Sequence, residues 1–112
     1  MAVDRSKVLA AAQKYLGKSQ FDRAIKEYTK LVEDDPNDVR IWLKIGDLYQ
    51  KVGDNRSAVV TYTRVADYYA DQGFFLKAVA VYKRIIKLQP GKLDISMRLG
   101  EMYENLQLVS DA

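Results

Sequence analysis

The 112-residue sequence contains neither cysteine nor histidine. The lack of cysteine excludes disulfide bonds, thiolate metal ligands and thiol nucleophiles. The lack of histidine excludes imidazole ligands and every catalytic triad that depends on that side chain. These two absences remove the commonest chemistry of enzyme and metal sites. We therefore expect no catalytic residue, no bound metal and no cofactor.

Carboxylates are the remaining candidates for acid–base chemistry, which would require a shared pocket. Asp34 and Asp35 precede Pro36 at a predicted helix end, where turn and capping roles account for them. Asp67 and Asp71 are four residues apart on one predicted helix, so they share a face, and hydration explains the pair. The same explanation covers Glu101 and Glu104. None of these pairs indicates an enzyme.

Long apolar runs are also missing. No run reaches the roughly 18 apolar residues that a transmembrane helix needs. The first residues lack the apolar core of a secretory signal, and Ala2 excludes myristoylation. A cytoplasmic protein is therefore expected. The basic, amphipathic segment at residues 5–18 leaves a membrane-surface or targeting helix as an alternative.

No sign of charge dominates the chain. It has 18 basic and 15 acidic residues, a net charge of +3, and the two signs are interspersed from Asp4 to Asp111. Such mixing is typical of solvated helix faces and does not indicate a phosphate-binding stripe. With 48% hydrophobic residues, the composition indicates a single folded domain over residues 1–112.

What the chain does contain is a set of aromatic and small residues at repeated distances. Several pairs are 34 residues apart: Tyr15 and Tyr49, Ala24 and Ala58, Tyr28 and Tyr62. The step then shortens to 20 residues, joining Tyr49 to Tyr69, Gly53 to Gly73, Ala58 to Ala78 and Tyr62 to Tyr82. The 34-residue step returns between Tyr69 and Tyr103. A period in this range predicts a solenoid of stacked helical units, whose usual role is to present a surface.

Apolar residues three or four positions apart predict helices throughout, and no strand pattern occurs. We predict six helices, at about residues 5–17, 20–33, 39–52, 55–71, 74–88 and 93–106. Ser19, Asp38 and Asp54 are the predicted N-caps of the second, third and fourth helices, because their side chains accept hydrogen bonds from a first helical turn. The short loops make neighbouring helices antiparallel.

Residues 39–72 resemble a tetratricopeptide repeat, a pair of antiparallel helices of 34 residues. Trp42 and Tyr49 occupy the large aromatic positions of the first helix, and Gly46 lies between them. Gly53 stands at the turn, and the second helix carries the small and aromatic residues Ala58 and Tyr62. Further matches outside these residues are Tyr15, Phe21, Ala24, Tyr28 and Pro36, then Phe75, Ala78, Tyr82 and Pro90, then Gly100 and Tyr103.

The resemblance implies an all-α fold, a right-handed α-solenoid of antiparallel helix pairs. It places repeats at about residues 5–38 and 39–72, an overlapping third unit at about 59–92 and a partial fourth at about 93–112. The 20-residue step makes the helix from Asp54 to Asp71 the second helix of one repeat and the first of the next. One helix is therefore expected to be shared between two overlapping repeats.

The repeats also predict the environment of individual residues. Gly46 is in a helix interior, where glycine costs about 1 kcal/mol relative to alanine, so we expect a close helix–helix approach there. Seven of the eight tyrosines are at repeat positions and are predicted to be core residues, with Tyr68 the exception. Trp42 is likewise expected to pack in the core. Tyrosine stacking on nucleic acid bases is the less favoured interpretation.

The end of the sequence follows the same spacing. Residues 106–112 match residues 52–58, so the chain stops where another helix is expected to begin. Solenoids end in polar capping helices, whereas residues 93–106 are largely apolar. We expect this chain to be the N-terminal part of a longer protein. The alternative is a homo-dimer formed through an exposed last helix.

In the family that the chain resembles, the first helix of each unit lines a concave groove that binds a partner protein. Carried over to this sequence, that groove contains Leu9 and Gln13 from the first helix, and Arg40, Leu43, Lys44, Asp47 and Lys51 from the third. Three basic residues beside a leucine suit a peptide with an acidic group and an apolar anchor. The alternative interpretation is that these are ordinary exposed helix positions.

Other partners fit the sequence less well. Relatives that clamp the acidic tail of heat-shock chaperones require lysine and asparagine where this chain has Leu9 and Gln13, and asparagine where it has Lys44. Helical repeats of similar length bind RNA, but acidic residues dilute the basic ones here. We therefore expect a scaffold that binds a protein or peptide, and we expect no nucleic acid. A self-associating structural module is the competing hypothesis.

Overall fold

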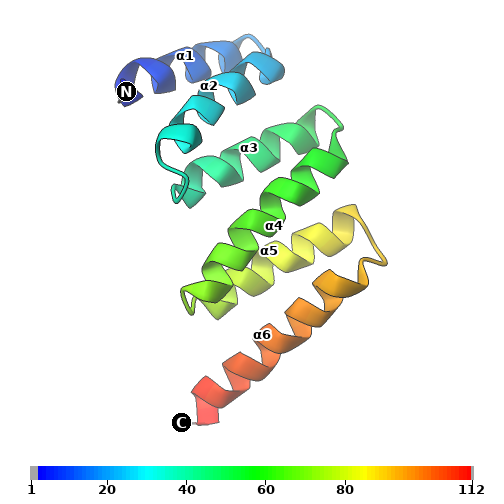
Figure 1. The fold of residues 1–112 in the computed structure, drawn as a ribbon. Helices are drawn as coiled ribbons and strands as arrows, with labels where there is room; N and C mark the ends of the chain where they lie inside the picture. The colour runs from blue at the N-terminus through cyan, green and yellow to red at the C-terminus, as the bar shows by residue number, and fades with distance from the viewer. Residues whose placement is uncertain (1–2, 112) are drawn as a thin grey trace. The chain divides into compact units, whose positions relative to one another are not determined.

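The computed structural model describes residues 3–111, which form six α-helices and no strand (Figure 1). The helices are α1 (Arg5–Gly17), α2 (Phe21–Asp34), α3 (Val39–Lys51), α4 (Asn55–Asp71), α5 (Phe75–Leu88) and α6 (Leu93–Asp111). The predicted all-α class is confirmed. Among the residues described, no helix combines the length and apolar character needed to cross a membrane. The chain divides into two compact units, Met1–Ala58 and Val59–Ala112.

In the first unit, α1 packs against α2 and α2 packs against α3, with successive helices running back and forth (Figure 1). Its core residues are three or four positions apart on each helix, so that each helix turns one apolar face inward. They are Val8, Ala12, Ala24, Ile25, Tyr28, Leu31, Val32, Ile41, Ile45 and Leu48. Trp42 is half-buried against this core, and its indole nitrogen donates to the Pro36 carbonyl at 2.8 Å.

In the second unit, α5 packs against α6 and the two helices run in opposite directions (Figure 1). The buried apolar residues are Val59, Tyr62, Val65 and Ala66 of α4, Ala78, Val79, Val81, Tyr82 and Ile85 of α5, and Ile95 and Met102 of α6. Tyr62 is also in contact with α5, because the Arg84 guanidinium lies 4.5 Å from the centre of its ring. In the opposite direction, the α5 tyrosine Tyr82 contacts α4 through its hydroxyl group.

The repeated tyrosine and glycine spacing corresponds to one helix-end geometry that occurs three times. The carbonyls of Tyr15, Tyr49 and Tyr69 each accept a hydrogen bond from the N–H five residues later, at 2.9, 2.9 and 2.8 Å. The residue four positions after each tyrosine is in the left-handed conformation, with φ of 56° at Ser19, 82° at Gly53 and 80° at Gly73. This pattern is the Schellman motif, which satisfies carbonyls left without partners at a helix C-terminus.

Two of the three predicted helix caps are confirmed. The side chain of Asp38 accepts a hydrogen bond from the Ile41 N–H, and that of Asp54 accepts one from the Ser57 N–H. The predicted Ser19 cap is wrong. Ser19 occupies the left-handed position that ends α1, and the residue that precedes α2 is Gln20, whose side chain makes no capping hydrogen bond.

The predicted end of the last helix is also wrong. The 34-residue step from Gly73 leads to residue 107, where a turn is expected. That residue is Gln107, and α6 continues through it to Asp111. A non-glycine residue resists the left-handed conformation that the turn requires, so the helix is not interrupted there. The last residue of the expected turn, Ala112, lies outside the described residues.

The tyrosines differ more in burial than their common spacing predicts. Tyr28, Tyr62 and Tyr82 are fully buried, as expected of core residues, whereas Tyr103 is 46% exposed and was wrongly assigned to the core. Tyr68, the predicted exception, is half-buried and makes an edge contact with Tyr69. Burial is decided by which face of a helix meets a neighbour, and the face of α6 that carries Tyr103 is left open.

Candidate functional site

An open cleft of about 320 Å³ lies on the first unit. Four of its lining residues belong to α3, at spacings of three and four that place them on one helix face. The complete lining is Leu16 of α1, Tyr28 of α2, and Lys44, Asp47, Leu48 and Lys51 of α3. The cleft therefore combines two leucines and a tyrosine with two lysines and one aspartate.

Both lysines of this cleft are next to aromatic rings. The Lys44 Nζ atom lies 5.6 Å from the centre of the Tyr28 ring, and the Lys51 Nζ atom lies 5.2 Å from that of Phe21. An ammonium group over a ring face is attracted to it electrostatically, which restricts where the lysine can point. Burial raises the pKa of Tyr28, so its hydroxyl stays protonated at neutral pH. The first cleft thus presents two oriented positive charges beside an apolar wall.

The structure brings together some of the groove residues predicted from sequence and separates others. Lys44, Asp47 and Lys51 line the first cleft. Leu9 is half-buried and packs against the core of the first unit, and Leu43 is half-buried on α3. The remaining two, Gln13 and Arg40, are exposed and are not part of the cleft lining.

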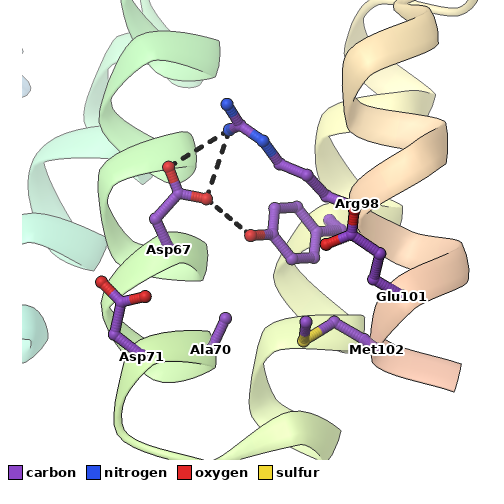
Figure 2. Close-up of a pocket in the computed structure, with 7 residues that line it drawn as sticks. Asp67, Ala70, Asp71, Arg98, Glu101 and Met102 are labelled. Carbon is purple, nitrogen blue, oxygen red and sulfur yellow. Dashed lines mark hydrogen bonds and ion pairs between the residues drawn. The ribbon is translucent and has the colours of Figure 1, made fainter. Parts of the chain in front are cut away.

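A second open cleft, of about 330 Å³, lies on the second unit (Figure 2). Its walls come from α4 and α6, and one residue of α5 completes it. The lining residues are Asp67, Ala70 and Asp71 of α4, Tyr82 of α5, and Arg98, Glu101 and Met102 of α6. The side chains of Asp67 and Arg98 extend toward each other from facing helices (Figure 2).

Asp67 is the centre of a hydrogen-bonded group in this second cleft. The Tyr82 hydroxyl donates to Asp67 Oδ1 at 2.6 Å. Arg98 Nη1 donates to both carboxylate oxygens, at 3.2 Å to Oδ1 and 3.1 Å to Oδ2. Burial, and then the hydrogen bond to Asp67, raise the pKa of Tyr82 well above its ordinary value of 10.0. The tyrosine is therefore a permanent donor that fixes the carboxylate in place.

This geometry corrects the sequence-based interpretation of the acidic pairs. Asp67 is not merely hydrated, because it joins α4 to α5 through Tyr82 and to α6 through Arg98. The other member of the pair, Asp71, is exposed and lines the cleft beside it. Glu101 also lines the cleft and Glu104 does not. Sequence spacing alone could not separate these roles, because the partners come from other helices.

The two clefts are equivalent positions of one repeat pattern. Adding 54 residues, the sum of the 34- and 20-residue steps, converts most of the first lining into the second. The corresponding pairs are Leu16 and Ala70, Tyr28 and Tyr82, Lys44 and Arg98, Asp47 and Glu101, and Leu48 and Met102. The same step carries Gln13 to Asp67. The second cleft could therefore have been located from the sequence by applying both steps in succession.

The charge of the site changes between the two units. The first cleft has two lysines and one aspartate, a net charge of +1, whereas the second has three carboxylates and one arginine, a net charge of −2. Three replacements produce the difference: Gln13 by Asp67, Gly17 by Asp71, and Lys51 by Asn105. Five lining positions of the site are repeated while its net charge changes sign.

Neither cleft has the ligands of a metal centre. Among the side chains that the structure describes, residues 3–108, no group of three or more acidic residues is placed to hold a metal ion. What the two linings share is a mixture of charged and apolar side chains around a tyrosine.

Three models of one protein family match the sequence. A "TPR repeat" model matches residues 12–53, and two "Tetratricopeptide repeat" models match residues 39–72 and 63–112. Together these matches cover residues 12–112 without a gap. The ranges overlap at residues 39–53 and at residues 63–72, and most of the second overlap belongs to α4. No curated protein sequence matches the chain.

Solved structures support the same fold. The type III secretion chaperone SycD of Yersinia enterocolitica, in complex with a peptide of the translocator YopD, is 19% identical with a TM-score of 0.53, and 97% of each chain is covered. PcrH in complex with the chaperone binding region of PopD is 20% identical with a TM-score of 0.50, covering 94% of this chain and 92% of that one. At these identities the similarity establishes the fold only.

Proposed function

Because the chain belongs to the tetratricopeptide repeat family, we propose that it is an interaction module that binds a peptide or helix of a partner protein in the first cleft. Similar structures of this fold hold such ligands: SycD a peptide of YopD, and PcrH a region of PopD. Binding of this kind requires complementary shape and charge, and no covalent bond is made or broken. No residue of the cleft is therefore given a catalytic role.

The observation that carries this proposal is the composition of the first cleft. Lys44 and Lys51 are oriented by aromatic rings, and they line the same cleft as Leu16 and the accessible edge of Leu48. An acidic group of a partner would pair with the lysines, and an apolar side chain would be removed from water against the leucines. We propose that Leu9, Gln13, Arg40 and Leu43, on the same two helices, extend this surface beyond the cleft.

A double charge reversal, Lys44→Glu with Lys51→Glu, tests the proposal. The full chain is used to capture a partner, and the dissociation constant of that partner is then measured for each variant. We expect the double variant to bind about tenfold or more weakly, since each lost surface ion pair contributes up to about 1 kcal/mol.

The matched control is Lys26→Glu, which changes the charge of an exposed α2 lysine that is outside both clefts. It should leave the affinity nearly unchanged. The unfolding free energies of all three proteins should agree within about 1 kcal/mol. Equal affinity of the double variant and the control for an identified partner would contradict the assignment of the first cleft.

One observation favours the alternative of self-association. The helix α6 exposes Leu93, Met97 and Leu108, with 72%, 60% and 67% of their surfaces accessible. Apolar side chains gathered on one element are typical of surfaces that meet another protein. A second copy of this chain is therefore the second candidate partner.

A further inference from the structure

We infer that the second cleft binds a basic side chain, an arginine or a lysine, presented by a protein partner. The inference rests on the proposed function, because it extends binding from the first unit to the equivalent position of the second. The inference differs from the proposed function in the charge of the ligand at that position. The two clefts would recognise opposite charges.

The repeat provides the first step of the argument. Tyr82, Glu101 and Met102 occupy the positions of Tyr28, Asp47 and Leu48 of the first cleft, 54 residues later. Corresponding lining positions on equivalent helices suggest the same kind of ligand, a side chain of a protein partner. The acidic replacements then change which charge that ligand carries.

The second step of the argument concerns two carboxylates of the cleft that pair with no other side chain among those described. Asp67 is already held by Tyr82 and Arg98. Asp71 and Glu101, both exposed, form no hydrogen bond or ion pair with the part of the chain that the structure describes. After the Asp67–Arg98 pair is counted, these two carboxylates give the cleft its net charge of −2. An incoming cation would find two acceptors at the cleft wall.

The third step is the fit of a long basic side chain. Arginine and lysine carry three or four methylene groups before the charged head, and these groups pack on apolar surface while the head stays near water. Half-buried Ala70 supplies apolar surface within the same lining, and Met102, which is 6% exposed, adds a small part of it (Figure 2). Arg98 shows the arrangement within the chain itself, since it spans the space between α6 and α4 to place its guanidinium on Asp67.

Two short peptides that differ only in charge test the inference. Acetyl-Ala-Arg-Ala-amide is titrated into the isotope-labelled full chain, and its citrulline counterpart, which is neutral and nearly the same shape, is titrated separately. We expect the arginine peptide to shift backbone amide signals at residues 67–71 and 98–102, with a citrulline response at least threefold weaker. The difference should shrink as salt is added, because exposed charges are screened.

Glu101→Gln and Glu104→Gln are the matched pair of variants. Both remove one exposed carboxylate from α6, but only Glu101 lines the cleft. We expect Glu101→Gln to raise the dissociation constant of the arginine peptide about threefold and Glu104→Gln to leave it unchanged. Equal responses to arginine and citrulline, or equal effects of the two variants, would overturn the inference.

A third peptide separates this inference from the proposed function. Acetyl-Ala-Glu-Leu-Glu-amide should shift signals of α3 in the first cleft and leave residues 98–102 unaffected. If the acidic peptide binds and the arginine peptide does not, only the inference fails. If the arginine peptide alone binds at the second cleft, the inference stands and the assignment of the first cleft fails.

Discussion

Tyr28 and Tyr82 occupy equivalent positions and have the same burial, yet they have different surroundings. Each is about 1% exposed, and each lies at the base of one cleft. The ring of Tyr28 faces the Lys44 ammonium group, whereas the hydroxyl of Tyr82 donates to the Asp67 carboxylate. The residue 54 positions before Asp67 is the neutral Gln13. The replacement of Gln13 by Asp67 on a neighbouring helix therefore provides Tyr82 with a carboxylate as its hydrogen-bond acceptor.

Tyr82→Phe is expected to lower the unfolding free energy by about 1–2 kcal/mol at pH 7, because it removes a hydrogen bond to a charged group. The pKa of Tyr82 is raised above 10.0, so the folded protein keeps a proton that the unfolded chain loses. The stabilisation is thus complete below pH 10 and declines as the pH rises beyond it.

Urea unfolding of both proteins at pH 7 and pH 10.5 measures this effect. The difference in unfolding free energy between wild type and Tyr82→Phe should be smaller at the higher pH. Tyr103→Phe, which removes an exposed hydroxyl, is the control and should change stability by less than about 0.5 kcal/mol. A difference that does not vary with pH would contradict the proposed role of the Tyr82 proton.

Two helical glycines should respond to substitution in opposite directions. Gly46 is buried, so Gly46→Leu is expected to overpack its surroundings and to destabilise the protein by about 1–3 kcal/mol. A Cβ atom at Gly100 would meet no atom within 4 Å, so Gly100→Ala should stabilise α6 by about 0.5–1 kcal/mol. Thermal unfolding of both variants provides the comparison. An unchanged melting temperature for Gly46→Leu would refute close packing at that residue.

At the scale of the helices, the repeated spacing of tyrosine and glycine reflects a common geometry at helix C-termini. The helices α1, α3 and α4 end with the same pair of backbone hydrogen bonds. Each is followed by one residue in the left-handed conformation: Ser19, Gly53 or Gly73. Two family models overlap at residues 63–72, of which residues 63–71 belong to α4. We propose that α4 is shared between two repeats, because its apolar residues are distributed over more than one face.

Of the three left-handed positions, Ser19 is expected to have the highest conformational energy, because it is not glycine. A residue with a Cβ atom costs about 1–2 kcal/mol in that conformation, whereas glycine adopts it freely. We expect Ser19→Gly to stabilise the protein by about 0.5–1 kcal/mol, since part of the relief is offset by the greater freedom of glycine in the unfolded chain. Gly53→Ser and Gly73→Ser should each destabilise it by about 1 kcal/mol. Chemical unfolding of the three variants checks the sign, and destabilisation by Ser19→Gly would contradict this account.

At the scale of the whole chain, the two proposed sites would give one molecule two binding chemistries. A cleft of net charge +1 and one of −2 occupy equivalent positions of the two units, although the chain as a whole carries only +3. Net charge is therefore a poor guide to the partner, because opposite local charges cancel in the total. A single partner with both acidic and basic segments, or two different partners, would satisfy both sites.

Sedimentation of the purified chain distinguishes the interaction module from the self-associating module. As an interaction module, the chain should sediment as a monomer whose sedimentation coefficient is independent of concentration. Association that increases with concentration and is abolished by Met97→Glu would instead assign the exposed face of α6 to a second copy. Lys14→Gln, which lowers the net charge by the same one unit at an exposed position of α1, controls for the change in charge.

Much of the fold was accessible from the sequence because it is encoded locally. Six helices follow from apolar residues three or four positions apart, and Asp38 and Asp54 cap helices through bonds to residues three positions later. The same local reasoning failed at Ser19, where a polar residue suited to capping instead takes the left-handed position. It failed again at Gln107, because the spacing predicts where a turn belongs and the residue type decides whether it forms.

The candidate site was accessible only in part. Lys44, Asp47 and Lys51 share one face of a single helix, so their helical spacing already groups them, and the structure places all three in the first cleft. The second cleft brings Asp67 together with Tyr82 and Arg98, which are 15 and 31 residues away on two other helices. No local pattern joins those residues.

The sequence by itself determined the family, the helices and the positions at which the pattern repeats, because these depend on contacts within a few residues or on fixed spacings. The tertiary structure alone decided which of the repeated residues are buried and which charged groups face each other. Tyr82 and Tyr103 both belong to the repeat, yet the first is buried and bonded to α4 while the second is 46% exposed on α6. Burial and electrostatic pairing depend on neighbours from distant parts of the chain, which spacing does not specify.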